Sequence, residues 1–145
     1  MRGYSLIEVL IILSIVSIII MITPLKPTIL LGLEEKRELR EFASDIQYTR
    51  NRTIVESSMY SIIIYPNKNY YVVTHHASTA RQVIKRKELT KGIKLISTNI
   101  PNNEIIFTYT GRPLNAGTIY LEDSKGKIIE ISVTPVTGKV NIKYR

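Results

Sequence analysis

The pattern of hydrophobic and polar positions divides the chain into three stretches. Residues 4–23 are apolar almost throughout and carry a single charge, Glu8. Residues 24–58 are amphipathic, with apolar positions that recur every three or four residues. Residues 59–145 hold short runs of β-branched and aromatic residues separated by turn-forming residues. These periods predict an apolar helix, an amphipathic helix and a set of strands.

The apolar stretch is long enough for a membrane helix. A helix over residues 4–23 would span roughly 30 Å, the thickness of the hydrocarbon core of a bilayer. Ser14 and Ser17 are tolerated because their hydroxyls can bond to carbonyls one turn earlier. A charge costs about 2.5–3.5 kcal/mol at the bilayer centre and less near the interface. Glu8 therefore either lies near the headgroups or has a function within the helix.

A cleaved secretory signal peptide fits this stretch poorly. Such a peptide has a basic segment, an apolar core of about 7–15 residues and a cleavage site made of small residues. Here Arg2 is the only early positive charge, the acid lies inside the apolar run, and residues 23–27 offer no small-residue site.

The second stretch predicts a helix over residues 28–57. Pro24 and Pro27 precede it, and a proline removes a backbone donor, so we expect a kink or break near Pro24. Like charges four residues apart, such as Glu34 and Glu38, repel each other, so packing of an apolar stripe must hold this helix. The stripe consists of Leu30, Leu33, Leu39, Phe42, Ala43, Ile46 and Ile54, and the charged residues are expected on the other faces.

The third stretch predicts an antiparallel β domain. Residues 61–65 and 70–74 flank a Pro-Asn-Lys-Asn turn and form the signature of a hairpin, and the polar residues 75–82 predict a loop. Further strands are expected at residues 83–89, 93–97, 105–109, 118–122, 128–133 and 140–144. One long helix followed by such strands is an α+β layout, in which the helix covers one face of the sheet.

The head of the chain resembles the N-terminal signature of type IV pilins and pseudopilins. Residues 1–3 match a short basic leader that ends in glycine, and residues 4–10 match the run that opens a hydrophobic helix. The resemblance implies a pilin fold and cleavage by a prepilin peptidase between Gly3 and Tyr4. It also implies N-methylation of the new Tyr4 amine. Tyrosine stands here where the family usually has phenylalanine.

The resemblance implies an assembly role for Glu8, the fifth residue after cleavage. Its carboxylate would pair with the N-terminal amine of another subunit in a filament. Opposite charges attract strongly in a low-dielectric setting, and removing one partner of a buried pair costs about 3–5 kcal/mol. Glu8 is therefore expected to set the register of subunits.

The resemblance also implies where the protein lies and what it meets. Residues 4–23 would be a single membrane pass that becomes the filament core, with the N terminus in the cytoplasm and the C-terminal domain outside. Assembly would place the subunit in an extracellular or periplasmic filament. The implied partners are prepilin peptidase, other pilin or pseudopilin subunits, the inner-membrane assembly platform and the membrane.

A narrower resemblance is to the type II secretion protein H-like minor pseudopilins. It rests on the helix end at residues 48–57, which leads into the hairpin, and on the glycine turns at Gly111, Gly117 and Gly138. The sequence is thus identified as a minor pilin or pseudopilin. A type II secretion system, a type IV pilus and a competence pseudopilus all remain open as the machine.

Positive charge is concentrated in the C-terminal part. The net charge is +8, and residues 59–145 hold thirteen basic against five acidic residues. Two explanations of this positive charge are open. The domain binds an acidic partner, such as phospholipid headgroups, cell-wall polyanions or nucleic acid, or the charge serves solubility alone. In single-strand binding, bases stack on aromatic rings while cations follow the phosphates. The candidate DNA-binding residues are Arg81, Lys85, Arg86, Lys87, Lys139, Lys143 and Arg145.

Motifs of catalysis and metal binding are missing from the sequence. There is no cysteine, no phosphate-binding loop, no HExxH and no Gly-x-Ser-x-Gly, and the adjacent His75 and His76 fall in the predicted loop. We expect no cofactor, no metal and no enzymatic activity. Two alternatives stay open: a tip adhesin or DNA-binding competence subunit that uses the basic β domain, and an anchored surface protein that never polymerises.

Overall fold

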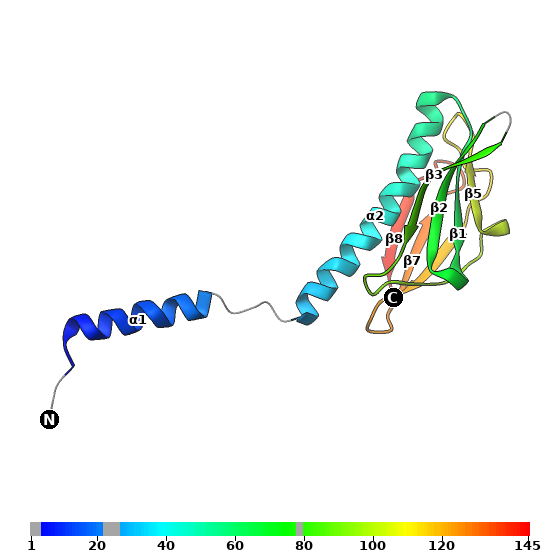
Figure 1. Cartoon of the computed structure of the whole chain (residues 1–145). Helices are drawn as coiled ribbons and strands as arrows, with labels where there is room; N and C mark the ends of the chain where they lie inside the picture. Colours follow the sequence, from blue (N-terminus) through cyan, green and yellow to red (C-terminus); the bar gives the residue numbers. More distant parts are fainter. Residues whose placement is uncertain (1–3, 22–26, 78–79) are drawn as a thin grey trace. The chain divides into compact units, whose positions relative to one another are not determined.

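The computed structural model describes residues 4–21, 27–77 and 80–145, which form two compact units, Met1–Leu30 and Leu31–Arg145. Figure 1 labels both α-helices and most of the strands. The helices and strands are α1 Leu6–Met21, α2 Pro27–Glu56, β1 Tyr60–Tyr65, η1 Pro66–Lys68, β2 Tyr70–His76, β3 Arg81–Glu88, β4 Lys94–Thr98, η2 Pro101–Asn103, β5 Glu104–Phe107, β6 Thr118–Glu122, β7 Ile128–Val133 and β8 Val140–Tyr144.

Helix α1 is apolar on every side and has no buried residue. Its two serines behave as the sequence predicts, because Ser14 and Ser17 each donate to a carbonyl four residues earlier at 2.8 Å. Among the described residues, no helix combines the length and the apolar character needed to cross a membrane. The end of the predicted 4–23 span and the expected kink at Pro24 fall within residues 22–26, outside the described residues.

The middle of the predicted stripe on α2 is confirmed. Leu39, Phe42 and Ile46 are at most 1% exposed and face the strands. Towards the C-terminal end the stripe continues through Thr49 and Thr53, which are fully buried. Their hydroxyls donate to the carbonyls four residues earlier, at 2.6 and 2.9 Å. With its hydroxyl satisfied in this way, a threonine can line the core like a small apolar residue.

Three members of the predicted stripe lie outside the core. Ile54 is 41% exposed, because the buried face has turned to the threonines at this end of α2. Leu30 and Leu33 are 46% and 57% exposed. Among the described residues, the core cluster contains no residue before Leu39.

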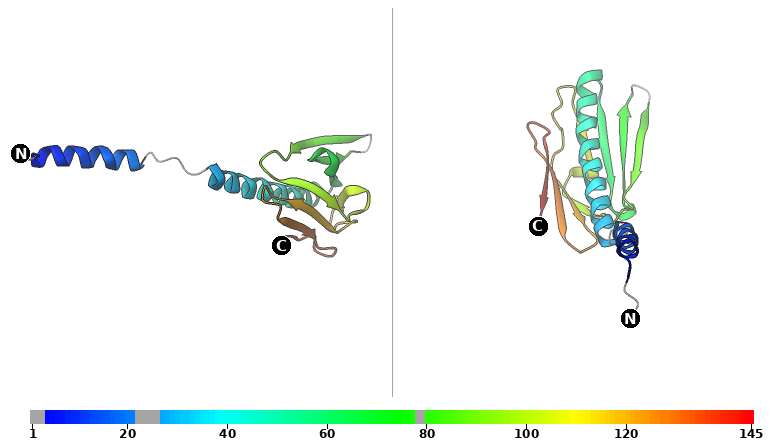
Figure 2. Two further views of the ribbon diagram at one scale, coloured as in Figure 1. Left: turned by 90° about the horizontal axis from the view of Figure 1, so that it is seen from below. Right: turned by 90° about the vertical axis from the view of Figure 1, so that its left-hand side faces the viewer.

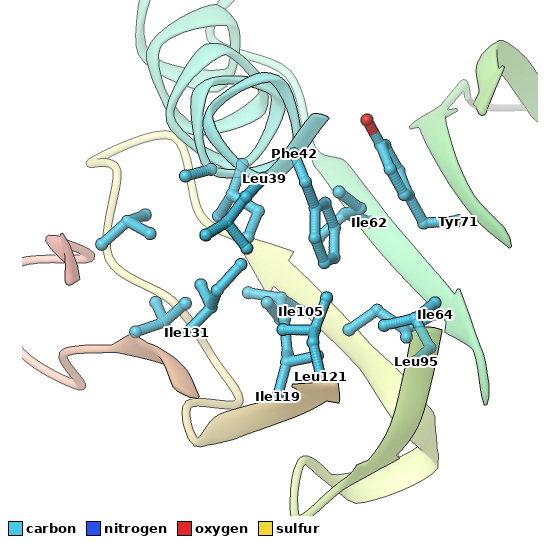
Figure 3. Packing of buried hydrophobic residues seen from close by; sticks show 14 of the residues in the cluster. Leu39, Phe42, Ile62, Ile64, Tyr71, Leu95, Ile105, Ile119, Leu121 and Ile131 are labelled. Atoms are coloured by element: carbon cyan, nitrogen blue, oxygen red, sulfur yellow. The ribbon is translucent and has the colours of Figure 1, made fainter. Parts of the chain in front are cut away.

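The strands form two antiparallel sheets rather than the one predicted. Sheet A has the order β3-β2-β1-β5, and sheet B has the order β4-β6-β7-β8. Both sheets pack on α2, and in the right-hand view of Figure 2 β8 lies on one side of this helix and β2 and β3 on the other. Figure 3 shows the shared core, in which Phe42 of α2, Ile62 of sheet A and Ile119 of sheet B are fully buried.

The predicted hairpin is confirmed, but the loop after it is shorter than expected. Strands β1 and β2 pair in register from Tyr60 opposite His75 to Tyr65 opposite Tyr70. His75 and His76 therefore lie in β2 and not in a loop, and β3 already begins at Arg81. The polar residues at the end of β2 contact residues of the neighbouring strand β1. A local sequence pattern does not reveal such partners.

Candidate functional site

The N-terminal motif forms the start of α1. The carbonyl of Ser5 accepts the amides of Glu8 at 3.0 Å and Val9 at 3.2 Å, which closes the first helical turn. Glu8 lies in this turn, where the positive end of the helix dipole favours a carboxylate. Tyr4 is 79% exposed, and Gly3 lies outside the described residues.

The apolar side chains of α1 are all solvent-exposed. Their exposed fractions range from 43% at Val16 to 90% at Met21. A helix that is apolar on every side is stable only when lipid or other helices cover it. The geometry thus provides a continuous hydrophobic rod with a carboxylate in its first turn.

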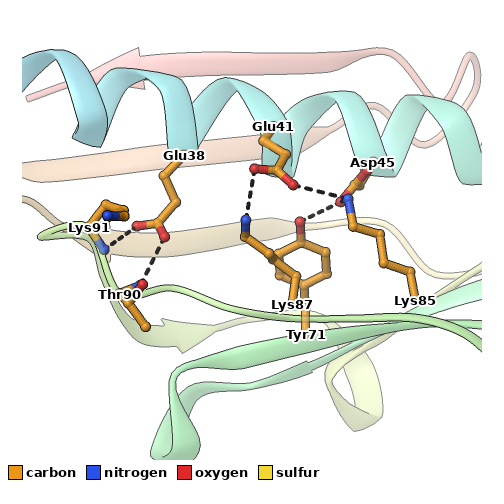
Figure 4. A network of polar contacts seen from close by, with 8 residues as sticks. All are labelled: Glu38, Glu41, Asp45, Tyr71, Lys85, Lys87, Thr90 and Lys91. Atoms are coloured by element: carbon orange, nitrogen blue, oxygen red, sulfur yellow. Dashed lines mark hydrogen bonds and ion pairs between the residues drawn. The ribbon is translucent and has the colours of Figure 1, made fainter.

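Lys85 and Lys87 do not form the free basic surface that the sequence predicts. They lie on the side of β3 that faces α2, where Lys87 reaches Glu41 at 3.0 Å. Lys85 reaches Glu41 at 3.1 Å and Asp45 at 2.7 Å. Asp45 also accepts the hydroxyl of the buried Tyr71 at 2.5 Å, and Figure 4 shows the whole network. We call these five residues the α2–β3 clamp.

The pKa values of the clamp follow from these contacts. Hydrogen bonding to Lys87 and Lys85 outweighs the opposing effect of burial and lowers the pKa of Glu41. Burial by itself would lower the pKa of Lys85, but its bonds to Asp45 and Glu41 raise that pKa overall. Burial and the bond to Asp45 raise the pKa of Tyr71, so its hydroxyl stays protonated and donates.

Arg81 and Arg86 lie on the other face of β3, pointing away from α2. Arg81 lies 3.2 Å from the carboxylate of Glu104, and Arg86 lies 3.0 Å from that of Glu88. The guanidinium of Arg86 also stacks over the ring of Tyr70, 4.2 Å from its centroid. These two arginines therefore share one face of sheet A.

The remaining candidates lie on sheet B. Lys139 and Lys143 are exposed and have no ion pair in the part of the chain that the structure describes, whereas Arg145 lies 2.8 Å from Glu130. Because β8 and β3 lie on opposite sides of α2 (Figure 2), the seven candidate DNA-binding residues do not form one surface. DNA binding stays a prediction.

A serine, a histidine and a glutamate do come together, but not as a catalytic triad. The hydroxyl of Ser61 lies 2.9 Å from Nε2 of His76 and donates to Oε1 of Glu104 at 2.6 Å. In a triad the carboxylate holds the other ring nitrogen of the histidine, whereas Glu104 lies 3.6 Å from the same Nε2. Ser61 is also fully buried, so a substrate cannot reach it.

His75 and His76 have structural surroundings. His75 stacks on Tyr60, with 4.5 Å between ring centroids, and bonds to the hydroxyl of Ser58 at 2.6 Å. Burial and the nearby Arg81 lower the pKa of His76. Within the described ranges, no group of three or more His, Cys, Asp or Glu side chains could hold a metal ion.

Two acidic residues of α2 have roles that the sequence did not predict. Glu35 and Glu38 are 6% and 3% exposed, although the sequence pattern predicts both on the charged faces of the helix. Glu35 accepts the amide of Ser124 at 3.0 Å, and Glu38 accepts the amides of Thr90 and Lys91 at 2.8 and 3.0 Å. Their partners lie at least 52 residues away along the chain, so no local signal could have found them.

Comparison with solved structures identifies this arrangement. The minor pseudopilin EpsH from the type 2 secretion system of Vibrio cholerae matches with a TM-score of 0.57 and 9% identity, over 77% of this chain and 96% of that chain. The type IV minor pilin FimU of Pseudomonas aeruginosa matches with a TM-score of 0.57 and 14% identity, over 74% and 91% of the two chains. The chain has a minor pilin and pseudopilin fold.

A second crystal form of FimU matches with a TM-score of 0.54 and 15% identity, over 79% of this chain and 90% of that chain. No family model and no curated protein sequence matches the chain. At these identities the likeness concerns the fold, and it confirms the predicted pilin fold. The two neighbours are described as a minor pseudopilin and a type IV minor pilin.

Proposed function

We propose that this chain is a minor pilin or pseudopilin subunit of a type IV filament machine. The observation that supports this most strongly is an apolar helix without any buried residue, with an acid in its first turn, in a chain whose β domain has the minor pilin fold. Residues 4–23 anchor the subunit in the membrane before assembly, and prepilin peptidase removes residues 1–3. The β domain then lies outside the cytoplasm.

Assembly buries the apolar surface of α1 among the same helices of neighbouring subunits. In that environment the carboxylate of Glu8 pairs with an N-terminal amine, and a subunit whose Glu8 lacks such a partner is strongly disfavoured. This penalty aligns each incoming subunit before it is accepted. The assembly platform and the other pilin subunits are the partners of this step.

The first experiment determines the mature N terminus by mass spectrometry, with the chain co-expressed with an active prepilin peptidase. We expect a chain that begins at N-methylated Tyr4. A chain that still begins at Met1 would contradict the filament mechanism and leave an anchored surface protein.

The second experiment tests Glu8 in cells that make the cognate filament. Glu8→Ala is expected to lower the amount of this subunit in sheared filaments at least about tenfold. The reason is that an N-terminal amine buried without its carboxylate partner costs several kcal/mol. Glu34→Ala, which removes an exposed acid of α2, is the matched control and should assemble normally. Equal incorporation of both variants would rule out the proposed role of Glu8.

A further inference from the structure

The face of sheet A that points away from α2 contains a buried polar cluster. Side chains alternate along a strand, so Ser61, Thr74 and Glu104 lie on this outer face, opposite the core-facing Ile62 and Ile105. The three polar residues are 0%, 3% and 8% exposed. Such a face is usually solvated, and burying a carboxylate is costly unless it is paired.

The cluster holds one arginine in a defined position. Oε1 of Glu104 accepts the Ser61 hydroxyl at 2.6 Å and lies 3.2 Å from Nη1 of Arg81, and Oε2 lies 3.4 Å from Nη2. Ser61 is in turn bonded to the hydroxyl of Thr74 at 2.7 Å. The Arg81 side chain is still 49% exposed, so part of its guanidinium remains free to donate.

An open hollow of about 380 Å³ lies next to this arginine. It is formed where η1, η2 and the end of β1 meet, and its lining includes Tyr65, Lys68, Asn102 and Asn103 besides Arg81 and Glu104. Its volume lies within the range of about 300–1,000 Å³ that is typical of small-ligand sites. The ring of Tyr65 is stacked on Tyr70, with 4.6 Å between centroids, and is therefore held in place.

The groups around the hollow both donate and accept hydrogen bonds. The amides of Asn102 and Asn103 do both, Arg81 and Lys68 donate only, and Glu104 accepts. A simple anion would need donors alone, and a docked apolar side chain would need few of these groups. A sugar ring has hydroxyls around its edge and C–H groups on its faces, which suits mixed polar groups beside an aromatic ring. Two cations against one carboxylate add a preference for negative charge.

We propose that this hollow binds a sugar residue that carries a carboxylate group. Tyr65 provides the apolar contact, the paired asparagines bind hydroxyls, and Arg81 and Lys68 attract the anionic group. The Ser61–Glu104 pair acts indirectly, because it positions Arg81. This site lies in the β domain and does not depend on the proposed role of α1 in filament assembly.

The test uses the full chain in detergent micelles and isothermal titration calorimetry with trigalacturonate. Galactotriose is the neutral comparison, and hexaglutamate is the acidic peptide comparison. We expect trigalacturonate to bind at least about tenfold more tightly than galactotriose, a difference of about 1.4 kcal/mol. Absence of trigalacturonate binding, or tighter binding of hexaglutamate in competition with it, would overturn the proposal; the latter would indicate a protein partner.

Variants locate the binding to the hollow. The double variant Asn102→Gly, Asn103→Gly removes both amides but tolerates the left-handed backbone, with φ of 56° and 54°, that these positions require. This variant and Lys68→Gln are each expected to weaken binding at least about fivefold, whereas Lys143→Gln on sheet B should change it less than twofold. Thermal melting confirms that each variant is folded. Equal affinities of all variants would place the binding elsewhere and refute the site.

Discussion

Glu38 is a charged residue that acts as part of the core. Its neighbours along α2 suggested a repulsive surface position, yet it is 3% exposed and accepts two backbone amides of the connection after β3. These amides belong to Thr90 and Lys91, which directly follow the buried Leu89. The carboxylate therefore attaches this connection to the helix (Figure 4).

Replacing this carboxylate should destabilise the β domain. Glu38→Ala is expected to lower the free energy of unfolding by about 1–3 kcal/mol, because two backbone donors lose their acceptor. Urea unfolding of the full chain in detergent measures the change. Glu34→Ala on the same helix is the control: its side chain is 53% exposed and lies 3.6 Å from Lys91, so a change below about 1 kcal/mol is expected. Equal effects of the two variants would contradict this account.

Asn69 also shows how one side chain can join distant segments. The sequence identifies it only as a turn residue, and its φ of 53° confirms that role. Its amide group, however, donates to the carbonyls of Leu89 and Ile93 and accepts the amide of Leu95 at 2.6 Å. The turn of the first hairpin thereby holds the start of β4, a contact between the two sheets.

At the scale of elements, the α2–β3 clamp fixes the edge of sheet A to the helix. The basic side chains of β3 alternate between two faces, so Lys85 and Lys87 meet the acids of α2, whereas Arg81 and Arg86 point outward. The sequence shows the cluster of positive charge but not which cations the helix neutralises. Lys85 and Lys87 therefore belong to the clamp, whereas Arg81 lines the proposed sugar site.

The clamp should make stability depend on acid pH. The pKa of Glu41 is lowered in the folded state, so its contribution is present above its ordinary pKa of 4.5 and is lost as the pH falls through the lowered value. Because the side chain is 37% exposed, solvent screens the pair and the contribution should be about 1 kcal/mol or less. Glu41→Gln should remove this part of the pH dependence in urea unfolding between pH 3 and 7. An unchanged pH profile would contradict it.

At the scale of the whole molecule, one core joins α2 to both sheets. Its buried members run from Leu39 to Val140, and α1 contributes none of them. Two sheets that share one helix bury more side-chain surface than a single sheet with one covered face, and this places β3 and β8 on opposite sides of α2 (Figure 2). The basic residues of the C-terminal part are separated for the same reason.

The core predicts how the chain responds to truncation. A chain that begins at Pro27 should unfold in urea with a free energy within about 0.5 kcal/mol of that of the full chain in the same detergent, because the core cluster begins at Leu39. Leu39→Ala, which removes a residue that is 1% exposed, should cost about 2–5 kcal/mol and shows that the assay is sensitive. A loss of similar size on truncation would refute the prediction.

The sequence by itself determined the elements and their order. Alternation predicted β6, β7 and β8 with the bounds that the structure has, and the three-to-four residue period predicted the middle of α2. The apolar run with its two serines predicted a helix whose hydroxyls bond back to the backbone. These features are local, because the repeat of a strand or helix imposes its own period on the residues that it buries.

The tertiary structure alone decided which elements meet. The pairing of β1 with β5 brings Ser61 to Glu104, 43 residues away, and creates both the buried cluster and the hollow beside it. Tertiary packing also decided that the strands form two sheets and that Lys85 and Lys87 face acidic residues of α2. Such contacts depend on how strands and helices pack together, and a local pattern of hydrophobic and polar residues does not specify the partner of a charge or of a strand edge.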